Sequence, residues 1–587
     1  MADVPRYCIS QARCRLCQFR LEDGELVVAA VGDQDAVSPE FSFHRDTSFY
    51  DKKFFGAEVH MCCQNRCMFR TRSVDCFHSG CYTFRLFPVS PDFLAATEYS
   101  FQPPICEERR RRDLIQQNLV ERLKQTQWPR NLPDELWLLT AQYLVRECAI
   151  VTVQELTIQP RVCDSVFDLS RDVYVQYVMF EGARYLKSIK NSGCAEAKQE
   201  GQLLLDARRA RTVQKVYIAE DHLGIRHIQF ISSDDKSSRS SLDIPGVWWR
   251  TICRPNSIKI RAKTDVHLPR IRWQTPTNPV AVVDLATLQR PQQYPAFLRM
   301  GFSDCNAPDI TGYSIAVTSH CVATIHAHRR DTGLGFYQEV DASFRAIYWI
   351  HMPIDEGEYV TEICRPLGFK YMNRYDTLGL TFTTNRGRTT VFGSHSQILR
   401  EGVQFDRVYS PPETPTRIFF NTWDSLQDEK EIKFLAYSNP EPPAPRPLPI
   451  SAIPIWPVQN TRYNELWYYS SCAMRGITEI TLCVNRNLPH KPITGMLLRY
   501  EDGHKACVGQ MRLDWTLRPI VVGQAGKLRI GSLRTEKRFL YVAIISVRER
   551  VDRDDCSWLD VPWHGTLEWW FSLRNTVIRY SKVERNS

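Results

Sequence analysis

The period of the hydrophobic positions changes along the chain, and these changes predict where helices and strands lie. A first helix is predicted at about 105–127, and a second helical pair at about 133–155, because prolines at 129 and 133 break the pattern between them. The first helix has an apolar stripe at helical spacing: Leu114, Ile115, Leu119 and Leu123. Beyond about 160, runs rich in Val, Ile, Tyr and Phe alternate with turn residues and predict strands as far as 580. We expect an α+β chain that is mainly β.

Composition shifts divide this pattern into segments. A Pro-rich stretch at 439–459 predicts an extended spacer or a loop crossing between strands, since proline fixes φ and removes a donor. The expected segments are a Cys-rich module at 1–104, helices at 105–160, a β-rich module at 161–300, a second at 301–438, the Pro-rich segment at 439–459, and a third β-rich module at 460–587.

Charge and hydropathy exclude several classes of protein. The net charge is +9, from 75 basic and 66 acidic residues, which is mild for 587 residues. The run Arg109–Arg112 has no aromatic residues among it, so we expect a solvated helix face and no nucleic-acid partner. The longest apolar runs, such as 539–547, fall short of the ~18 residues of a membrane span, so no membrane partner is expected. No secretory signal is visible, which predicts a cytoplasmic or nuclear location.

Cysteine is concentrated near the start of the chain. Of 20 cysteines, eight fall within the first 81 residues: Cys8, Cys14, Cys17, Cys62, Cys63, Cys67, Cys76 and Cys81. In a chain without an export signal, such a cluster indicates metal rather than disulfides. Cys14 and Cys17 form a CxxC pair, while His78 and Cys81 form an HxxC pair. Four such ligands close a tetrahedral shell around zinc with no position left for water, so we predict one structural zinc.

The roles of the other cysteines stay open at this point. Cys62, Cys63, Cys67 and Cys76 could supply a second site or alternative ligands. The paired spacing resembles the treble-clef and cross-brace class of zinc modules. That resemblance implies a small zinc-stabilised module at 1–104.

The pattern of segment 131–144 predicts an amphipathic helix with favourable residues at its N-terminus. Pro133 suits a first helical turn, and the two acidic residues after it favour the positive end of the helix dipole. Apolar residues then share one face: Leu136, Leu139, Tyr143 and Leu144. The segment also resembles the start of an F-box, with Leu132-Pro133 at its opening and Tyr143-Leu144 at its helix end. This resemblance implies docking onto the Skp-type adaptor of a cullin ubiquitin ligase through Leu132, Pro133, Leu136, Leu139, Tyr143 and Leu144.

The β-rich half contains an internal repeat of glycines. Gly379, Gly387 and Gly393 are separated by eight and six positions, and Gly495, Gly503 and Gly509 have the same separations. Each copy predicts a strand, a loop and a hairpin whose turn needs a residue with φ above zero. Segment 357–393, with Gly-Glu-Tyr-Val-Thr-Glu-Ile followed by Leu-Thr-Phe-Thr-Thr-Asn-Arg-Gly, resembles the jacalin-like β-prism lectins. That implies a β-prism element and, by analogy, glycan recognition.

Taken together, the segments resemble a group of uncharacterised fungal F-box-like proteins. This predicts a substrate adaptor of a Skp–cullin ubiquitin ligase, not an enzyme, with β modules presenting a surface to a protein or glycan target. Two alternatives stay open. One is a lectin-like or protein-binding scaffold without a ubiquitin link. The other is a hydrolase that uses His320, Cys321, His326 and His328, where the strand period puts the last two on one face.

Overall fold

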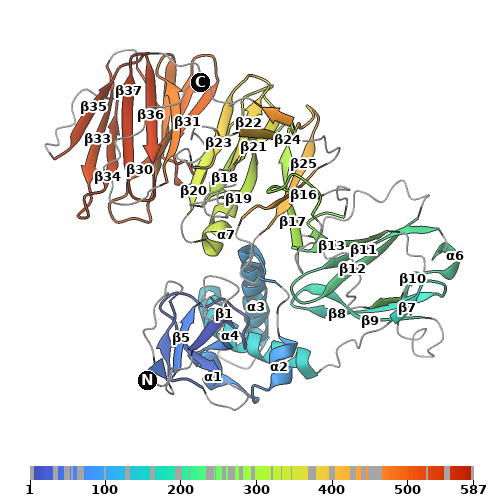
Figure 1. Ribbon diagram of the computed structural model, residues 1–587. Helices are drawn as coiled ribbons and strands as arrows, with labels where there is room; N and C mark the ends of the chain where they lie inside the picture. The colour runs from blue at the N-terminus through green and yellow to red at the C-terminus, as the bar shows by residue number, and fades with distance from the viewer. Residues whose placement is uncertain are drawn as a thin grey trace, which may run out of the picture. The chain divides into compact units, whose positions relative to one another are not determined.

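The computed structural model of the protein is mainly β, which confirms the expected fold class (Figure 1). The chain divides into two compact units. Unit 1 comprises 1–278 with short pieces at 295–299 and 424–428, and unit 2 comprises 279–294, 300–423 and 429–587. The residues that the structure describes are 6–30, 37–44, 53–54, 57–61, 72–97, 99, 101–125, 132–158, 166–191, 201–210, 212–232, 244, 246–253, 259–261, 271–276, 282–291, 298–318, 321–331, 333–344, 347–367, 379–394, 404–422, 431–437, 444–446, 466–523, 526–547 and 555–583.

Unit 1 begins with a small sheet of order β3-β2-β6-β1-β5-β4, followed by two short helices. Its elements are β1 (Arg6–Cys14), β2 (Leu26–Ala30), β3 (Phe41–Ser42), β4 (Lys53–Phe54), β5 (Ala57–Met61), β6 (Arg72–His78), α1 (Ser79–Phe84) and α2 (Pro91–Ala96). Strands β1 and β6 run parallel, with Cys14 opposite Cys76. We call this part, 6–97, the head. Parallel pairing brings the far ends of β1 and β6 together, although about 60 residues separate them in the sequence.

Two long helices pack on the head: α3 (Ile105–Gln125) and α4 (Asp134–Ile158). The predicted helical pair at about 133–155 is wrong, because α4 is one unbroken helix. Residues 146–149 have no Gly or Pro, and Val145, Ala149 and Val153 extend one buried stripe, so nothing interrupts the backbone hydrogen bonds. These residues share one hydrophobic core with Phe19, Phe77 and other residues of the head.

The expected solvated face of the arginine run is also wrong in part. Arg111 is buried, and its guanidinium pairs with Glu181 at the turn between β8 (Val173–Phe180) and β9 (Ala183–Asn191). Arg110 is bound to Glu107 one helical turn before it. A helix that packs between two modules buries one side of any charged run, and a buried arginine then needs an acidic partner.

The rest of unit 1 is built of strands. They are β7 (Val166–Asp168), β8 (Val173–Phe180), β9 (Ala183–Asn191), β10 (Gln202–Leu205), β11 (Val213–Glu220), β12 (Ile225–Ser232), β13 (Trp248–Cys253), β14 (Lys259–Arg261) and β15 (Ile271–Trp273), with the short helix α6 (Ala207–Ala210). The sheet orders here are β10-β8-β9, β14-β7 and β12-β11-β13-β15. Val175, Ile189, Ile218 and Ile228 belong to one core between the strands.

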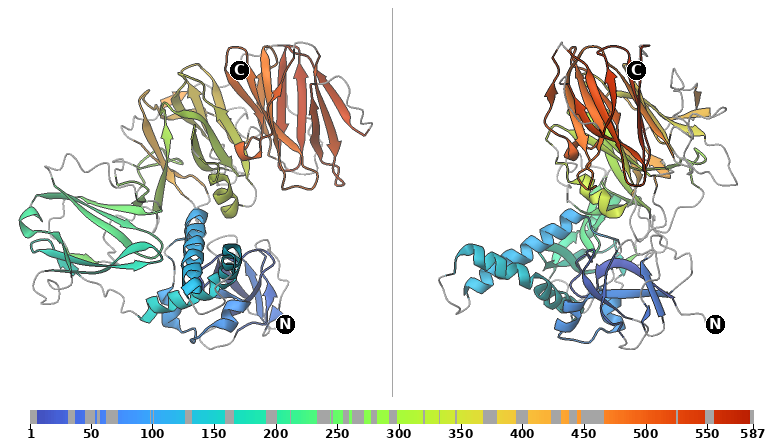
Figure 2. Two further views of the ribbon diagram at one scale, coloured as in Figure 1. Left: turned by 180° about the vertical axis from the view of Figure 1, so that it is seen from behind. Right: turned by 90° about the vertical axis from the view of Figure 1, so that its left-hand side faces the viewer.

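Unit 2 contains the remaining strands and helix α7 (Figure 2). They are β16 (Val282–Asp284), β17 (Leu298–Cys305), β18 (Ile310–Val317), β19 (Val322–Arg329), α7 (Phe336–Ser343), β20 (Tyr348–Pro353), β21 (Val360–Leu367), β22 (Leu380–Thr384), β23 (Thr389–Phe392), β24 (Gln404–Tyr409), β25 (Thr416–Asn421), β26 (Phe434–Ala436), β27 (Ala444–Arg446), β28 (Tyr468–Ala473), β29 (Ile477–Val484), β30 (Ile493–Tyr500), β31 (Lys505–Gly509), η2 (Leu513–Trp515), β32 (Ile520–Val521), β33 (Leu528–Arg534), β34 (Leu540–Ser546), β35 (Ser557–Val561), β36 (Thr566–Phe571) and β37 (Thr576–Ser581). One continuous core runs from Leu285 to Phe571.

Both glycine-spaced copies fold as the same antiparallel meander. In the first copy β21 pairs with β22 and β22 with β23, and in the second β29 pairs with β30 and β30 with β31. Gly387 and Gly503 lie in the two hairpin turns with φ of 79° and 85°. Each of these glycines donates its N–H to the carbonyl three residues earlier, at 2.9 Å in both turns. The repeat is therefore a repeat of structure.

The Pro-rich stretch is described in one place only. β27 pairs with β24, so that Pro445 lies opposite Asp406. The rest of 439–459 lies outside the described residues.

Candidate metal centre

The four predicted ligands lie together in the head. Cys14 ends β1, Cys17 lies in the turn that follows, His78 ends β6, and Cys81 belongs to α1. Their ligand atoms all lie within 4.8 Å of one another, and all four residues are buried. The sequence-predicted set and the spatial cluster are thus the same four residues.

The geometry fits a tetrahedral ion of the size of zinc. Nδ1 of His78 lies 3.4 Å from Sγ of Cys17 and 3.6 Å from Sγ of Cys81. With Zn–S near 2.3 Å and Zn–N near 2.0–2.1 Å, tetrahedral angles require S···N separations of about 3.5 Å. One nitrogen and three sulfurs therefore surround a position suited to a structural zinc.

The turn that carries Cys17 is held by backbone bonds. The N–H of Cys14 donates to the carbonyl of Phe19, and the N–H of Gln18 donates to the carbonyl of Cys14, both at 2.9 Å. Gln18 has a φ of 64°, in the left-handed region that reverses the chain after the second cysteine. The N–H of His78 also points at Sγ of Cys14, 3.4 Å away. Such N–H groups stabilise negative charge on the sulfur.

Hydrogen bonds within the cluster shift the pKa values of Cys14 and His78. Burial alone would raise the pKa of Cys14, but hydrogen bonds with Cys17, Cys81 and His78 lower it well below its usual value. Burial would likewise lower the pKa of His78, yet hydrogen bonds with Cys14, Cys17 and Glu25 raise it to about 12. Hydrogen bonding within the cluster thus favours the thiolate form of Cys14, the form of cysteine that binds metal.

A carboxylate lies behind the histidine ligand. Oε2 of Glu25 is 3.1 Å from Nε2 of His78, and the other oxygen of Glu25 pairs with Arg146 on α4. Imidazole ligands usually donate their second N–H to such a group. Sequence reasoning missed both residues. Glu25 lies eight positions after Cys17 in an ordinary turn, and no spacing rule connects it with His78.

Of the other cysteines of this cluster, the two that the structure describes, Cys8 and Cys76, are not part of this shell. Cys76 is buried opposite Cys14, and burial, with Asp75 and Cys14 nearby, raises the pKa of its thiol. Its sulfur is not among the ligand atoms that lie within 4.8 Å of one another. Cys62, Cys63 and Cys67 lie outside the described residues.

The F-box-like residues form an exposed stripe on α4. Leu136, Leu139 and Tyr143 are 44%, 50% and 81% exposed, and Leu144 is exposed at the flank. Pro133 is exposed just before the helix, whereas Leu132 is partly buried. The opposite side of the helix is buried through Trp137, Ala141, Val145, Ala149 and Val153. The first turns of α4 therefore expose apolar side chains on one side of the helix and bury Trp137 and Ala141 on another.

The same helix is long and apolar enough to cross a membrane by length and composition, over Asp134–Val153. This corrects the expectation that no such stretch exists, which rested on uninterrupted apolar runs. A spanning helix would have to withdraw Val145 and Ala149 from the core they share with Cys17 and Cys81. The stretch Asp134–Val153 is 33% buried, and its buried part includes these two residues.

Of the residues of the hydrolase alternative, the structure describes Cys321, His326 and His328, and it does not bring Cys321 to the two histidines. Cys321 lies five strand residues from His326, about 16 Å at ~3.3 Å per residue, and its buried thiol contacts Thr318. Burial, with Glu431 nearby, raises the pKa of Cys321. His320 lies outside the described residues.

His326 and His328 do share a face of β19, with ring centroids 5.0 Å apart. His326 stacks on Phe336 at 3.6 Å. His328 instead joins a buried polar network in which Oγ of Ser314 lies 2.8 Å from its Nε2 and 3.0 Å from Nδ1 of His351. We call Ser314, His328, Tyr337 and His351 the buried histidine network. Its hydroxyl and imidazole groups satisfy one another inside the core.

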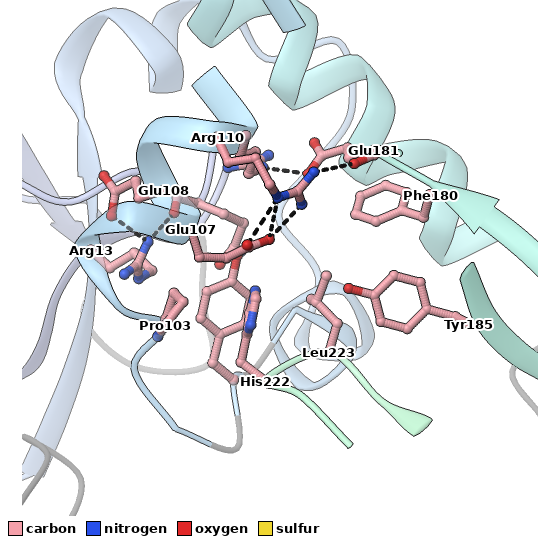
Figure 3. A pocket seen from close by; sticks show the side chains of 13 residues that line it. Arg13, Pro103, Glu107, Glu108, Arg110, Phe180, Glu181, Tyr185, His222 and Leu223 are labelled. Carbon is pink, nitrogen blue, oxygen red and sulfur yellow. Dashed lines mark hydrogen bonds and ion pairs between the residues drawn. The ribbon is translucent and has the colours of Figure 1, made fainter. Parts of the chain in front are cut away.

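A small pocket in unit 1 is lined by ion pairs and aromatic rings (Figure 3). Arg13 reaches Glu108 there, Arg110 binds Glu107, and His222 lies beside Tyr99. The free space is about 10 Å³, room for about one water molecule. Such a pocket is part of the packing between the helices and the β8–β9 turn and has no room for a substrate.

Comparison with known protein families and with curated proteins finds no match to this chain.

Proposed function

We propose that the protein is a docking adaptor whose zinc-stabilised head presents the apolar stripe of α4 to a Skp-type adaptor of a cullin ubiquitin ligase. The observation that carries this proposal is the exposure of Leu136, Leu139 and Tyr143 on a helix whose second half packs into the core of the head. A helix recognised in a groove depends on a few such apolar anchors one to two turns apart.

The resemblance to an F-box supplies the identity of the partner. It covers about 25 residues from Leu132, and α4 continues unbroken where an F-box would start its next helix. The proposed contact therefore uses the first three turns of α4. A protein or glycan target for the β modules, and a cytoplasmic or nuclear location, belong to the same proposal.

The metal has a structural role in this proposal. Three sulfurs and one nitrogen fill a tetrahedral shell, and the ligands are buried, so no open position remains for a substrate. The metal joins the ends of β1 and β6 and the start of α1, on which α4 packs. We assign it as zinc because three thiolates and one imidazole are its common structural set.

The test compares three leucines of α4. In the full chain, Leu136→Ala with Leu139→Ala should weaken binding to a purified Skp-type subunit at least tenfold. The melting temperature should change little, since half-exposed side chains contribute about 1 kcal/mol or less. Leu138→Ala is the matched control, because Leu138 is 45% exposed but lies away from the stripe.

Three outcomes would contradict the proposal. They are a wild-type chain that does not bind the Skp subunit, a control that loses binding equally, and a double variant that melts far below the wild type. The last would mean that the leucines are core residues, worth about 2–5 kcal/mol each when truncated. Binding of anionic vesicles in place of the Skp subunit would assign the stripe to a membrane surface.

A further inference from the structure

Glu25 occupies a position between the metal centre and α4. It belongs to the turn before β2, where its Oε2 accepts the N–H of Glu22 at 2.7 Å. Its side chain is 22% exposed, and it contacts His78 and Arg146 with different oxygens. One carboxylate therefore joins a metal ligand to a helix more than 100 residues further along the chain.

The contact with His78 decides which nitrogen can bind metal. Nδ1 of His78 faces the sulfurs, so a neutral imidazole must carry its proton on Nε2 to serve as a ligand. Glu25 accepts a hydrogen bond from that N–H at 3.1 Å. It thereby favours the tautomer with a free lone pair on Nδ1 and fixes the plane of the ring.

The contact with Arg146 connects Glu25, and through it His78, to α4. Arg146 follows the buried Val145 and lies one turn beyond Tyr143 of the exposed stripe. A second tie comes from α3, where Nη1 of Arg111 donates to the carbonyl of Cys17 at 2.7 Å. Helix α3 is thus bonded to the ligand residue Cys17, and α4 is bonded to Glu25, the carboxylate that contacts His78.

We propose that Glu25 is a positioning residue that couples metal binding to the anchoring of α4 on the head. When the ion is bound, His78 is fixed, Glu25 is held by His78, and Arg146 has a fixed partner. When the ion is removed, the sulfurs and the imidazole lose their common partner, and the anchor of α4 loosens at Arg146. The coupling rests on the proposed metal site but not on the identity of the docking partner.

Three variants of the full chain separate the two contacts of Glu25. Glu25→Ala removes both of them. Glu25→Gln keeps an oxygen acceptor for Nε2 but loses the charge that pairs with Arg146. Arg146→Gln leaves Glu25 and His78 intact and is the matched control for metal binding.

Zinc affinity is measured by competition with a chromophoric chelator, and the ligand field by cobalt substitution. Glu25→Ala should weaken zinc binding 10–100-fold, Glu25→Gln should recover part of that loss, and Arg146→Gln should stay within threefold of the wild type. Cobalt bound to the wild type should give the absorption of a tetrahedral site with three sulfurs.

Hydrogen exchange of α4 reports the anchoring. Exchange around Arg146 should accelerate in all three variants, and in the wild type after zinc is removed by chelation. The comparison of the wild type with and without chelator does not depend on the folding of any variant. An unchanged rate there, or a Glu25→Ala affinity within threefold of the wild type, would overturn the coupling.

A wild type that binds no zinc would overturn the metal site together with the coupling. The leucine test of the docking stripe would still stand by itself. Loss of Skp binding in the leucine variants would support the docking proposal. Zinc-dependent exchange of α4 that is unchanged in those variants would separately support the coupling through Glu25.

Discussion

At the scale of single residues, burial and the partner of each side chain decide what the chemistry-bearing groups do. Cys17 and Cys76 are both buried thiols of the head, yet only Cys17 has His78 and two other sulfurs around it. His326 and His328 lie two residues apart on one strand, yet one stacks on a ring and the other joins hydroxyl groups. The residue type alone distinguishes neither pair.

The first prediction concerns a metal ligand. Cys17→Ala in the full chain should abolish binding of about one zinc per chain and unfold the head, because structural zinc binding is largely folding free energy. Metal analysis and protease resistance measure both effects. Cys106→Ala is the control, since Cys106 is an exposed cysteine of the same unit. Full zinc content in Cys17→Ala would remove Cys17 from the shell.

The second prediction concerns the buried histidine network. Burial, the largest cause, lowers the pKa of His351 to about 3 and, together with His351 and His326, that of His328 to about 2. Their unfolded pKa is near 6.5, so below that pH the unfolded chain binds protons that the folded chain refuses. Stability should be unaffected above pH 7. It should fall by up to about 1.4 kcal/mol per pH unit per histidine as the pH drops from 6.5.

Urea unfolding of unit 2 at pH 7.5 and 5.5 measures this loss. His351→Asn keeps a polar atom near the position of Nδ1 but does not titrate, and should lessen the pH dependence. His490→Asn, at an exposed histidine, is the control. Equal slopes in the two variants would show that the network does not control acid stability.

At the scale of elements, two glycines of the second copy are required for different reasons. Gly503 lies in a hairpin turn, and Gly509 lies where two strands approach closely. Gly503 has a φ of 85°, and a Cβ added there would have no other atom within 4 Å. Gly509 has a φ of 78°, and a Cβ there would lie 2.4 Å from the carbonyl oxygen of Thr494. Gly503 is needed for conformation alone, whereas Gly509 is needed for conformation and space.

The third prediction follows from that contrast. Gly503→Ala should cost about 1–2 kcal/mol of unfolding free energy, the penalty of a left-handed residue with a Cβ. Gly509→Ala should cost clearly more, since backbone atoms must also move. Gly503→Asn, which tolerates this conformation, should recover part of the loss. Chemical denaturation of the three variants provides the ranking, and equal costs for the two alanines would contradict it.

At the scale of the whole molecule, the two units differ in what stabilises them. The head and α4 share a core that contains the candidate ligands Cys14, Cys17 and Cys81, whereas the continuous core of unit 2 consists mainly of aliphatic and aromatic side chains. A fragment that ends near residue 105 would lack Ile115, Val145 and Ala149 of the core of the head. Studies of the metal site therefore need α3 and α4.

The fourth prediction uses this difference. Calorimetry of the full chain should resolve two transitions, and a zinc chelator should lower only the transition of unit 1, because binding to the folded state stabilises that state alone. Limited proteolysis of the heated protein assigns each transition to a unit. A chelator that shifts both transitions equally would show that the units unfold together.

The sequence by itself determined the features that depend on near neighbours in the chain. The spacing of Cys14 with Cys17, and of His78 with Cys81, identified four ligands that the structure brings together, and glycine spacing identified two hairpin turns. The mainly β fold followed from local periodicity as well. Each of these rests on residues a few positions apart, where backbone geometry limits the alternatives.

Only the tertiary structure decided which distant side chains lie opposite one another. Parallel pairing of β1 with β6 closed the gap of about 60 residues between the two ligand pairs. Packing of α3 and α4 joined Glu25 to Arg146, buried Arg111 beside Glu181 and left the leucine stripe of α4 exposed. A local pattern contains no information about the surface that an element will meet, and the partners of buried charges are set by that surface.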